Sequence, residues 1–293
     1  MMTPPLRSGL LAFAGFALAG TIAAQTPPPP KIQFPAPSPA CTLKQRVGLT
    51  DIEIVYSRPG LKGRVVVGRI NPYGEVWRAG ANAATRITFS TPVSFGGTEV
   101  PAGTYGLFAI PGATEWTVIL NKIANQWGAY SYNPTDDVVR VTATPVRIDP
   151  PVETFTIGIN DIRDESATLN LTWADWRVPV KLGVDVVSIL EPQIEAVMAS
   201  DAPKKPYAQA AMFYGDHNLH LDEAVKWMDA AIAAQPDAFF LIYHKAVILA
   251  KMGDKAAAEA AARQSMDLAA KQTGPEKDEY IRLNQELIAG LHG

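Results

Sequence analysis

Short runs in which apolar residues occupy every second position fill the chain from about residue 43 to residue 185. In one of them Ile52, Ile54 and Tyr56 alternate with the residues between them, and the run 86–90 repeats the pattern. Similar short runs occur at 93–95, 98–100, 105–110, 116–120, 138–146, 154–159, 167–173 and 178–184. A period of two is typical of half-buried strands, and turn residues such as Gly96 and Gly97 separate the runs. The pattern predicts an antiparallel, jelly-roll-like β-sandwich over residues 43–188.

The pattern changes after residue 185, where alanine becomes frequent and apolar residues recur at helical spacing. Such spacing is seen in 224–232, again in 240–250 and in 258–266, and Pro275 begins a last helical stretch. An offset of 34 residues aligns Ala224 with Ala258 and Met228 with Ala262. This offset equals the period of tetratricopeptide-type helical hairpins. We therefore predict a small all-α, tetratricopeptide-like domain over residues 189–293, which makes the whole chain an α+β multidomain protein.

The N-terminal residues have the character of a secretion signal. Arg7 precedes the apolar stretch 9–20, and small residues follow up to Ala24. This order predicts a signal peptide over residues 1–24, because the apolar stretch is short for a membrane anchor. Residues 25–42 are rich in proline, which favours an extended spacer. We expect a protein exported to the periplasm or beyond, with no transmembrane span after cleavage.

Composition narrows the classes of partner. The chain has 293 residues, of which 47% are hydrophobic and 19% charged, as in globular proteins. A formal net charge of −3 argues against a nucleic-acid partner, whose phosphates favour a basic surface. Cys41 is the single cysteine, so no disulfide can form within the chain.

Several separate motifs of the β part resemble one known family. They are Tyr56-Ser57-Arg58-Pro59, Lys62-Gly63-Arg64, the segment 72–85, the stretch 101–105 and Trp127-Gly128-Ala129-Tyr130. On these motifs, residues from about 42 to 185 are identified as similar to the exported bacterial domain-of-unknown-function family 2911. The resemblance implies a secretion signal before the domain and often helical repeats after it. It brings no activity with it.

The segment 72–85 is the strongest candidate for a ligand site. Arg78 offers a planar cation that suits a carboxylate or phosphate, and Asn82 adds an amide. Tyr73 and Trp77 offer faces for stacking a sugar or an aromatic ligand. The alternative interpretation is structural. In it Trp77 is a buried anchor and Arg78 pairs with Glu75 or Asp51.

A second aromatic loop adds Trp127 and Tyr130 to the candidate ligand-binding residues. Flat sugar rings stack on such side chains, although these rings can equally pack over one end of the sandwich. Together with Glu75, these loops predict a site for a small anionic or sugar-like ligand.

The distribution of histidine limits the chemistry. All four histidines lie in the helical part, and the β part has neither a histidine nor a usable thiol. Histidine-based acid–base catalysis and Cys/His zinc sites are therefore not expected there. His217 and His220, with Asp222 and Glu223, occur at near-helical spacing, but their place between two helices favours an ordinary turn. We expect no catalytic residue, no metal and no cofactor.

The sequence thus favours a non-catalytic binding or scaffolding protein of the periplasm or cell envelope, with helical repeats that engage a protein partner. The rival hypothesis is a carboxylate-dependent glycan hydrolase that uses Glu75, Asp136 or Asp137. Such an enzyme needs two carboxyl groups about 5 to 9.5 Å apart, which sequence alone does not place.

Overall fold

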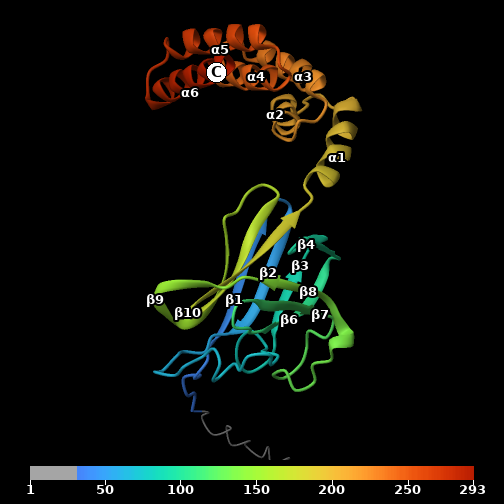
Figure 1. Ribbon diagram of the computed structural model, residues 1–293. Coiled ribbons are helices and arrows are strands. Elements are labelled where there is room, and N and C mark those ends of the chain that lie inside the picture. Colours follow the sequence, from blue (N-terminus) through green and yellow to red (C-terminus); the bar gives the residue numbers. More distant parts are fainter. Residues whose placement is uncertain (1–31) are drawn as a thin grey trace, which may run out of the picture. The chain divides into compact units, whose positions relative to one another are not determined.

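The computed structural model describes residues 32–293, which form two antiparallel sheets followed by six helices (Figure 1). The expected signal peptide 1–24 and the first part of the proline-rich spacer lie outside the described residues. The predicted order of a β part and then a helical part is confirmed.

The larger sheet has six strands in the order β1-β2-β3-β6-β7-β8, and each neighbouring pair is antiparallel. Strand β2 buries every second residue, as the alternation of its sequence predicts. The strands are β1 (Ala40–Val47), β2 (Thr50–Ser57), β3 (Thr85–Phe89), β6 (Gly103–Ile110), β7 (Trp116–Asn121) and β8 (Asp137–Ala143).

The smaller sheet has four strands in the order β5-β4-β10-β9. Gly96 and Gly97 have φ values of 58° and 92° and form the tight turn between β4 and β5, as their sequence predicts. Strands β9 and β10 pair along much of their length, with register shifts on either side of Ala174. The strands are β4 (Val93–Phe95), β5 (Thr98–Val100), β9 (Val146–Asn160) and β10 (Ser166–Val184).

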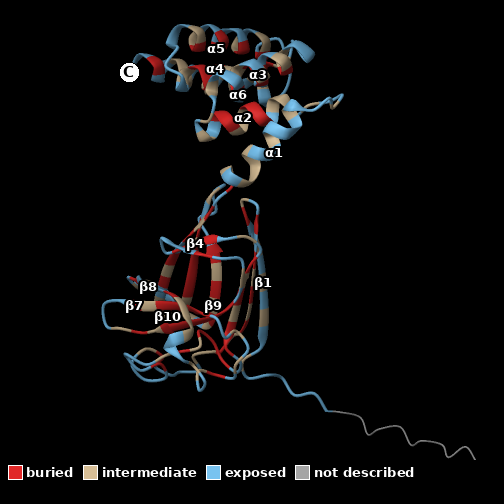
Figure 2. Cartoon of the chain, turned by 90° about the vertical axis from the view of Figure 1, so that its right-hand side faces the viewer, coloured by how far each residue is buried: buried red, intermediate tan, exposed pale blue. Residues whose placement is uncertain are grey.

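One hydrophobic core joins the two sheets. Phe89 and Leu107 contribute to it from the larger sheet, and Phe155 and Leu169 contribute from the smaller one. These side chains are fully buried, and buried residues run along the strands in Figure 2. Burying each such side chain contributes about 1.5 to 3 kcal/mol, so the sandwich is held chiefly by this layer.

The helical part consists of successive helices that pack on one another, with α2 on α3, α4 on α5 and α5 on α6. Ala224 and Met228 are fully buried, and so are Ala258 and Ala262, the residues that the predicted repeat aligns with them. The aligned positions therefore have the same degree of burial. The helices are α1 (Val187–Ala199), α2 (Tyr207–His217), α3 (Leu221–Ala234), α4 (Phe239–Lys251), α5 (Lys255–Ala269) and α6 (Pro275–His292).

Helices α2 and α4 approach closely at Gly215. A Cβ atom built there would lie 2.7 Å from Cγ1 of Ile248, which is too close for an ordinary contact. Within residues 32–293, no helix combines the length and the apolar character needed to cross a membrane.

Candidate functional site

Trp77 fixes the candidate segment 72–85 to the core of the sandwich. Its backbone N–H donates to the carbonyl of Ala109 over 2.7 Å, and its carbonyl accepts from the N–H of Ala109 over 2.8 Å. The side chain is only 7% exposed, and its ring stacks on that of Trp173 with centroids 5.8 Å apart. The indole N–H donates to the carbonyl of Gly80. Trp77 is therefore a buried anchor, and Trp173 covers one face of its ring.

The residues after Arg78 form a tight turn. Ala79 has a φ of 49°, in the left-handed region that a side chain disfavours, and its carbonyl accepts from the hydroxyl of Thr85 over 2.6 Å. A Cβ atom at Gly80 would lie 3.0 Å from the carbonyl oxygen of Ser57. The close approach of the backbone to β2 thus accounts for glycine at position 80 and holds Arg78 in a fixed place.

Arg78 is half-buried and has no ion pair or side-chain hydrogen bond within residues 32–293. Its Nε atom is fully buried without a partner. The pairing considered from the sequence is not formed, because Asp51 pairs with Arg46 over 2.7 Å and Glu75 is exposed. Burial lowers the pKa of Arg78 from its ordinary value, and the nearby Tyr130 opposes this in part. A half-buried cation without a counter-charge is costly, and an anion would relieve that cost.

A cavity of about 300 Å³ lies beside Arg78 and is called the Arg78 cavity here. Its walls carry a second cation, Arg64, and the amides of Asn71 and Asn82. The Nδ2 atom of Asn71 is buried without a partner. In contrast, Nδ2 of Asn82 donates to the carbonyl of Ser38 and to the hydroxyl of Ser57. Two cations, two amides and no carboxylate line this cavity, which gives it the character of a site for an anion.

The second candidate loop lies directly against the first. The N–H of Gly128 donates to the carbonyl of Asn82 over 3.1 Å, and Trp127 forms an isolated β-bridge with Ala83. Trp127 and Tyr130 are 67% and 87% exposed, so their rings are open to solvent. The structure thus places the Arg78 loop and the two exposed aromatic residues side by side.

The remaining candidates lie apart from the cavity wall. Tyr73 is 51% exposed, and its ring covers Gly68. Neither Tyr73 nor Glu75 lines the Arg78 cavity. Sequence analysis missed Arg64 and Asn71 as site residues. Arg64 stands in the motif Lys62-Gly63-Arg64, and Asn71 immediately precedes the candidate segment 72–85.

The carboxylates of the rival hydrolase hypothesis occupy other places. Asp137 accepts hydrogen bonds from Arg140 over 2.8 Å, from Tyr132 over 2.6 Å and from Asn121 over 2.8 Å. Its side chain is only 6% exposed. Asp136 ends the short 3₁₀ helix η1 (Pro134–Asp136). Neither of these carboxylates lines the Arg78 cavity, so the structure gives no acid–base pair there.

Comparison with known proteins places this sandwich in a family. The model of the family described as "Protein of unknown function (DUF2911)" matches residues 38–182. The sandwich is a DUF2911 domain. The matched range runs from the residues just before β1 nearly to the end of β10 and includes the whole Arg78 cavity. No curated protein and no solved structure matches the chain. The six helices that follow the DUF2911 domain lie beyond the matched range.

Proposed function

We propose that the DUF2911 domain is a non-catalytic binding domain whose Arg78 cavity takes a small anionic ligand, such as an organic acid, a phosphate ester or an acidic sugar. The half-buried guanidinium of Arg78, whose Nε lacks a partner in the described chain, carries the proposal. A carboxylate or phosphate in the cavity would accept from the Nη–H groups of Arg78, and a shift of the side chain that opens Nε to the cavity would pair this N–H as well, in the two-pronged manner that suits arginine.

The rest of the cavity supports the same class of ligand. The unpartnered Nδ2 of Asn71 is a second buried donor, and Arg64 adds positive charge. A volume of about 300 Å³ is at the small end of ligand pockets, which favours a ligand of monosaccharide size or less. Trp127 and Tyr130 lie beside the loop and offer open faces for a ring attached to the anionic group.

Thermal unfolding with a library of small carboxylates, phosphate esters and acidic sugars tests this proposal. A ligand that binds the native state raises the melting temperature by mass action. We expect such a ligand to stabilise the wild type but not Arg78→Gln. Arg69→Gln is the matched control, because Arg69 is an exposed arginine of the same long loop that does not line the cavity. No stabilisation by any member, or equal stabilisation of Arg78→Gln, would contradict the proposal.

The hydrolase alternative has a separate test. The purified protein is incubated with acidic and neutral glycans, and new reducing ends are measured for the wild type, Glu75→Gln and Asp136→Asn. We expect no turnover by any of the three proteins. Turnover by the wild type that either substitution abolishes would replace binding with catalysis as the function.

We also propose that residues 1–24 are a secretion signal and that the helical part forms tetratricopeptide-like hairpins that bind a protein partner. The predicted repeat aligns Ala224 with Ala258, and the equal burial of these two residues supports the hairpins. N-terminal sequencing of the mature protein should begin at Gln25. A photo-crosslinking residue in place of the exposed Phe240 should trap a partner, whereas one in place of Gln45 on β1 should not. Equal crosslinking from both positions would count against the helical surface.

A further inference from the structure

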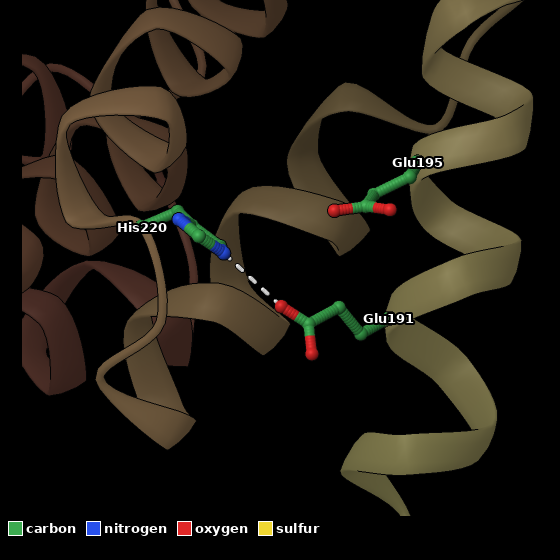
Figure 3. Close-up of side chains that lie close together, drawn as sticks. All are labelled: Glu191, Glu195 and His220. Carbon is green, nitrogen blue, oxygen red and sulfur yellow. Dashed lines mark hydrogen bonds and ion pairs between the residues drawn. The ribbon is translucent and has the colours of Figure 1, made fainter.

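Three side chains with metal-binding atoms meet between α1 and the turn that joins α2 to α3. Glu191 and Glu195 are one helical turn apart on α1, so they lie on one face of that helix. His220 precedes α3, and its Nε2 lies 3.1 Å from Oε1 of Glu191. One ligand atom from each of the three lies within 4.8 Å of the others. Figure 3 shows both carboxylates and the imidazole directed toward one another.

An independent feature of the same place is the hydroxyl of Tyr214. Tyr214 is fully buried on α2, and its hydroxyl has no hydrogen-bond partner in residues 32–293. Its ring lies against that of His220, with centroids 5.5 Å apart. A buried hydroxyl without a partner, on a ring that packs against His220, indicates that a polar group belongs beside this imidazole.

We propose that Glu191, Glu195 and His220 bind one divalent transition-metal ion of the zinc type, with a metal-bound water that hydrogen-bonds to Tyr214. Two carboxylates balance the charge of the ion, and a neutral imidazole is a preferred ligand of zinc. Three protein ligands and one water complete a tetrahedral shell. The imidazole disfavours calcium and magnesium, which take oxygen ligands.

The geometry requires only a small adjustment of the side chains. Ligand atoms about 2.0 to 2.2 Å from zinc lie roughly 3.5 Å from one another in a tetrahedral shell. His220 and Glu191 are already near this separation, at 3.1 Å. Glu195 is exposed, so its carboxylate can rotate inward without displacing a packed neighbour.

The ion would hold α1 to the helices that follow it. None of the 13 residues of α1 is fully buried, and Ile194 is its contribution to the neighbouring hydrophobic cluster. A helix with so little buried surface gains little from packing. A metal ion that bridges α1 and the α2–α3 turn would supply the missing attachment.

Calorimetric titration of the full chain, first treated with a chelator, with Zn²⁺ alone tests the site. We expect one ion per chain and a rise in melting temperature on binding. Glu195→Gln and His220→Gln should each weaken binding at least tenfold. Asp222→Asn, which removes an exposed carboxylate shortly beyond His220, is the matched control and should change affinity less than twofold.

Two further measurements separate this site from weak surface binding. Co²⁺ in place of Zn²⁺ should give the visible absorption of a tetrahedral site in the wild type but not in His220→Gln. Tyr214→Phe should keep the stoichiometry and weaken binding by about three- to tenfold. Unchanged affinity in Glu195→Gln, several weak ions per chain, or binding only at millimolar Zn²⁺ would each overturn the proposal.

Discussion

Trp77 and Trp173 stack with their ring planes 20° apart, and this contact ties a long loop of the larger sheet to strand β10 of the smaller one. The ring of Trp77 also lies edge-on to that of Phe155, with centroids 4.9 Å apart. The loop that carries Arg78 is therefore part of the core at one end, although Arg78 itself lines a cavity.

Trp77→Ala should destabilise the protein strongly. Removing a buried tryptophan leaves a void and typically costs about 3 to 5 kcal/mol. The control is Trp127→Ala, because Trp127 is the exposed tryptophan of the adjacent loop and should change the free energy of unfolding by less than about 0.5 kcal/mol. Urea unfolding measures both. Equal effects of the two substitutions would show that Trp77 is not an anchor.

Gly215→Ala and Gly290→Ala should act in opposite directions. Alanine at 215 brings a Cβ to 2.7 Å from Ile248 and should destabilise the protein by about 1 to 3 kcal/mol. Position 290 in α6 has open space around it, so alanine there should stabilise by about 0.5 to 1 kcal/mol through its helix propensity. The measurement is again chemical unfolding, and a stabilising Gly215→Ala would refute the close packing of α2 and α4.

Asp137→Asn should lower stability, because the carboxylate accepts from three donors and is nearly buried. Hydrogen bonds to a charged group contribute about 1.5 to 3 kcal/mol, and a loss in that range is expected. Asp136→Asn is the neighbouring control and should change stability little. If Asp137→Asn instead left stability intact and abolished a measured glycan hydrolysis, the structural role would be wrong.

His244 should make the protein less stable in mild acid. Burial lowers the pKa of His244, and the nearby Asp216 opposes this only in part. The folded protein therefore binds this proton less readily than the unfolded chain does, whose histidine has a pKa of about 6.5. Stability should fall as the pH decreases through that value. The free energy of unfolding of the wild type, compared with that of His244→Gln between pH 7.5 and 5.5, tests this. A steeper loss in the variant would contradict the sign.

The sequence predicts the fold well where neighbouring residues determine it. The alternation in β2, the Gly96-Gly97 turn and the helical spacing after residue 185 all depend on residues close in sequence, and the structure has the strand, the turn and the helices as expected. The candidate site is predicted less well. Whether Arg78 has an ion-pair partner depends on residues that lie far from it in the sequence. Asp51 is available to Arg78 in the sequence but pairs with Arg46 across the β1–β2 hairpin.

The metal-ligand cluster illustrates the same limit. Along the chain, the acidic neighbours of His220 are Asp222 and Glu223, which the sequence groups with it. In the structure its imidazole bonds to Glu191 and has Glu195 within 4.8 Å, and both of these residues come much earlier in the chain, on α1. Only the packing of helices brings these groups together, and no short-range pattern encodes it.

The double hydrogen bond between Trp77 and Ala109 has a consequence for recognition. It joins the backbone just before Arg78 to β6, a central strand of the larger sheet. The backbone that carries the Arg78 side chain is therefore held rigidly. A ligand that meets an arginine already held in place loses little free energy to ordering the protein. For the anionic ligand that we propose, the domain is therefore preorganised, and specificity would depend on the shape and charge of a cavity that exists before the ligand binds.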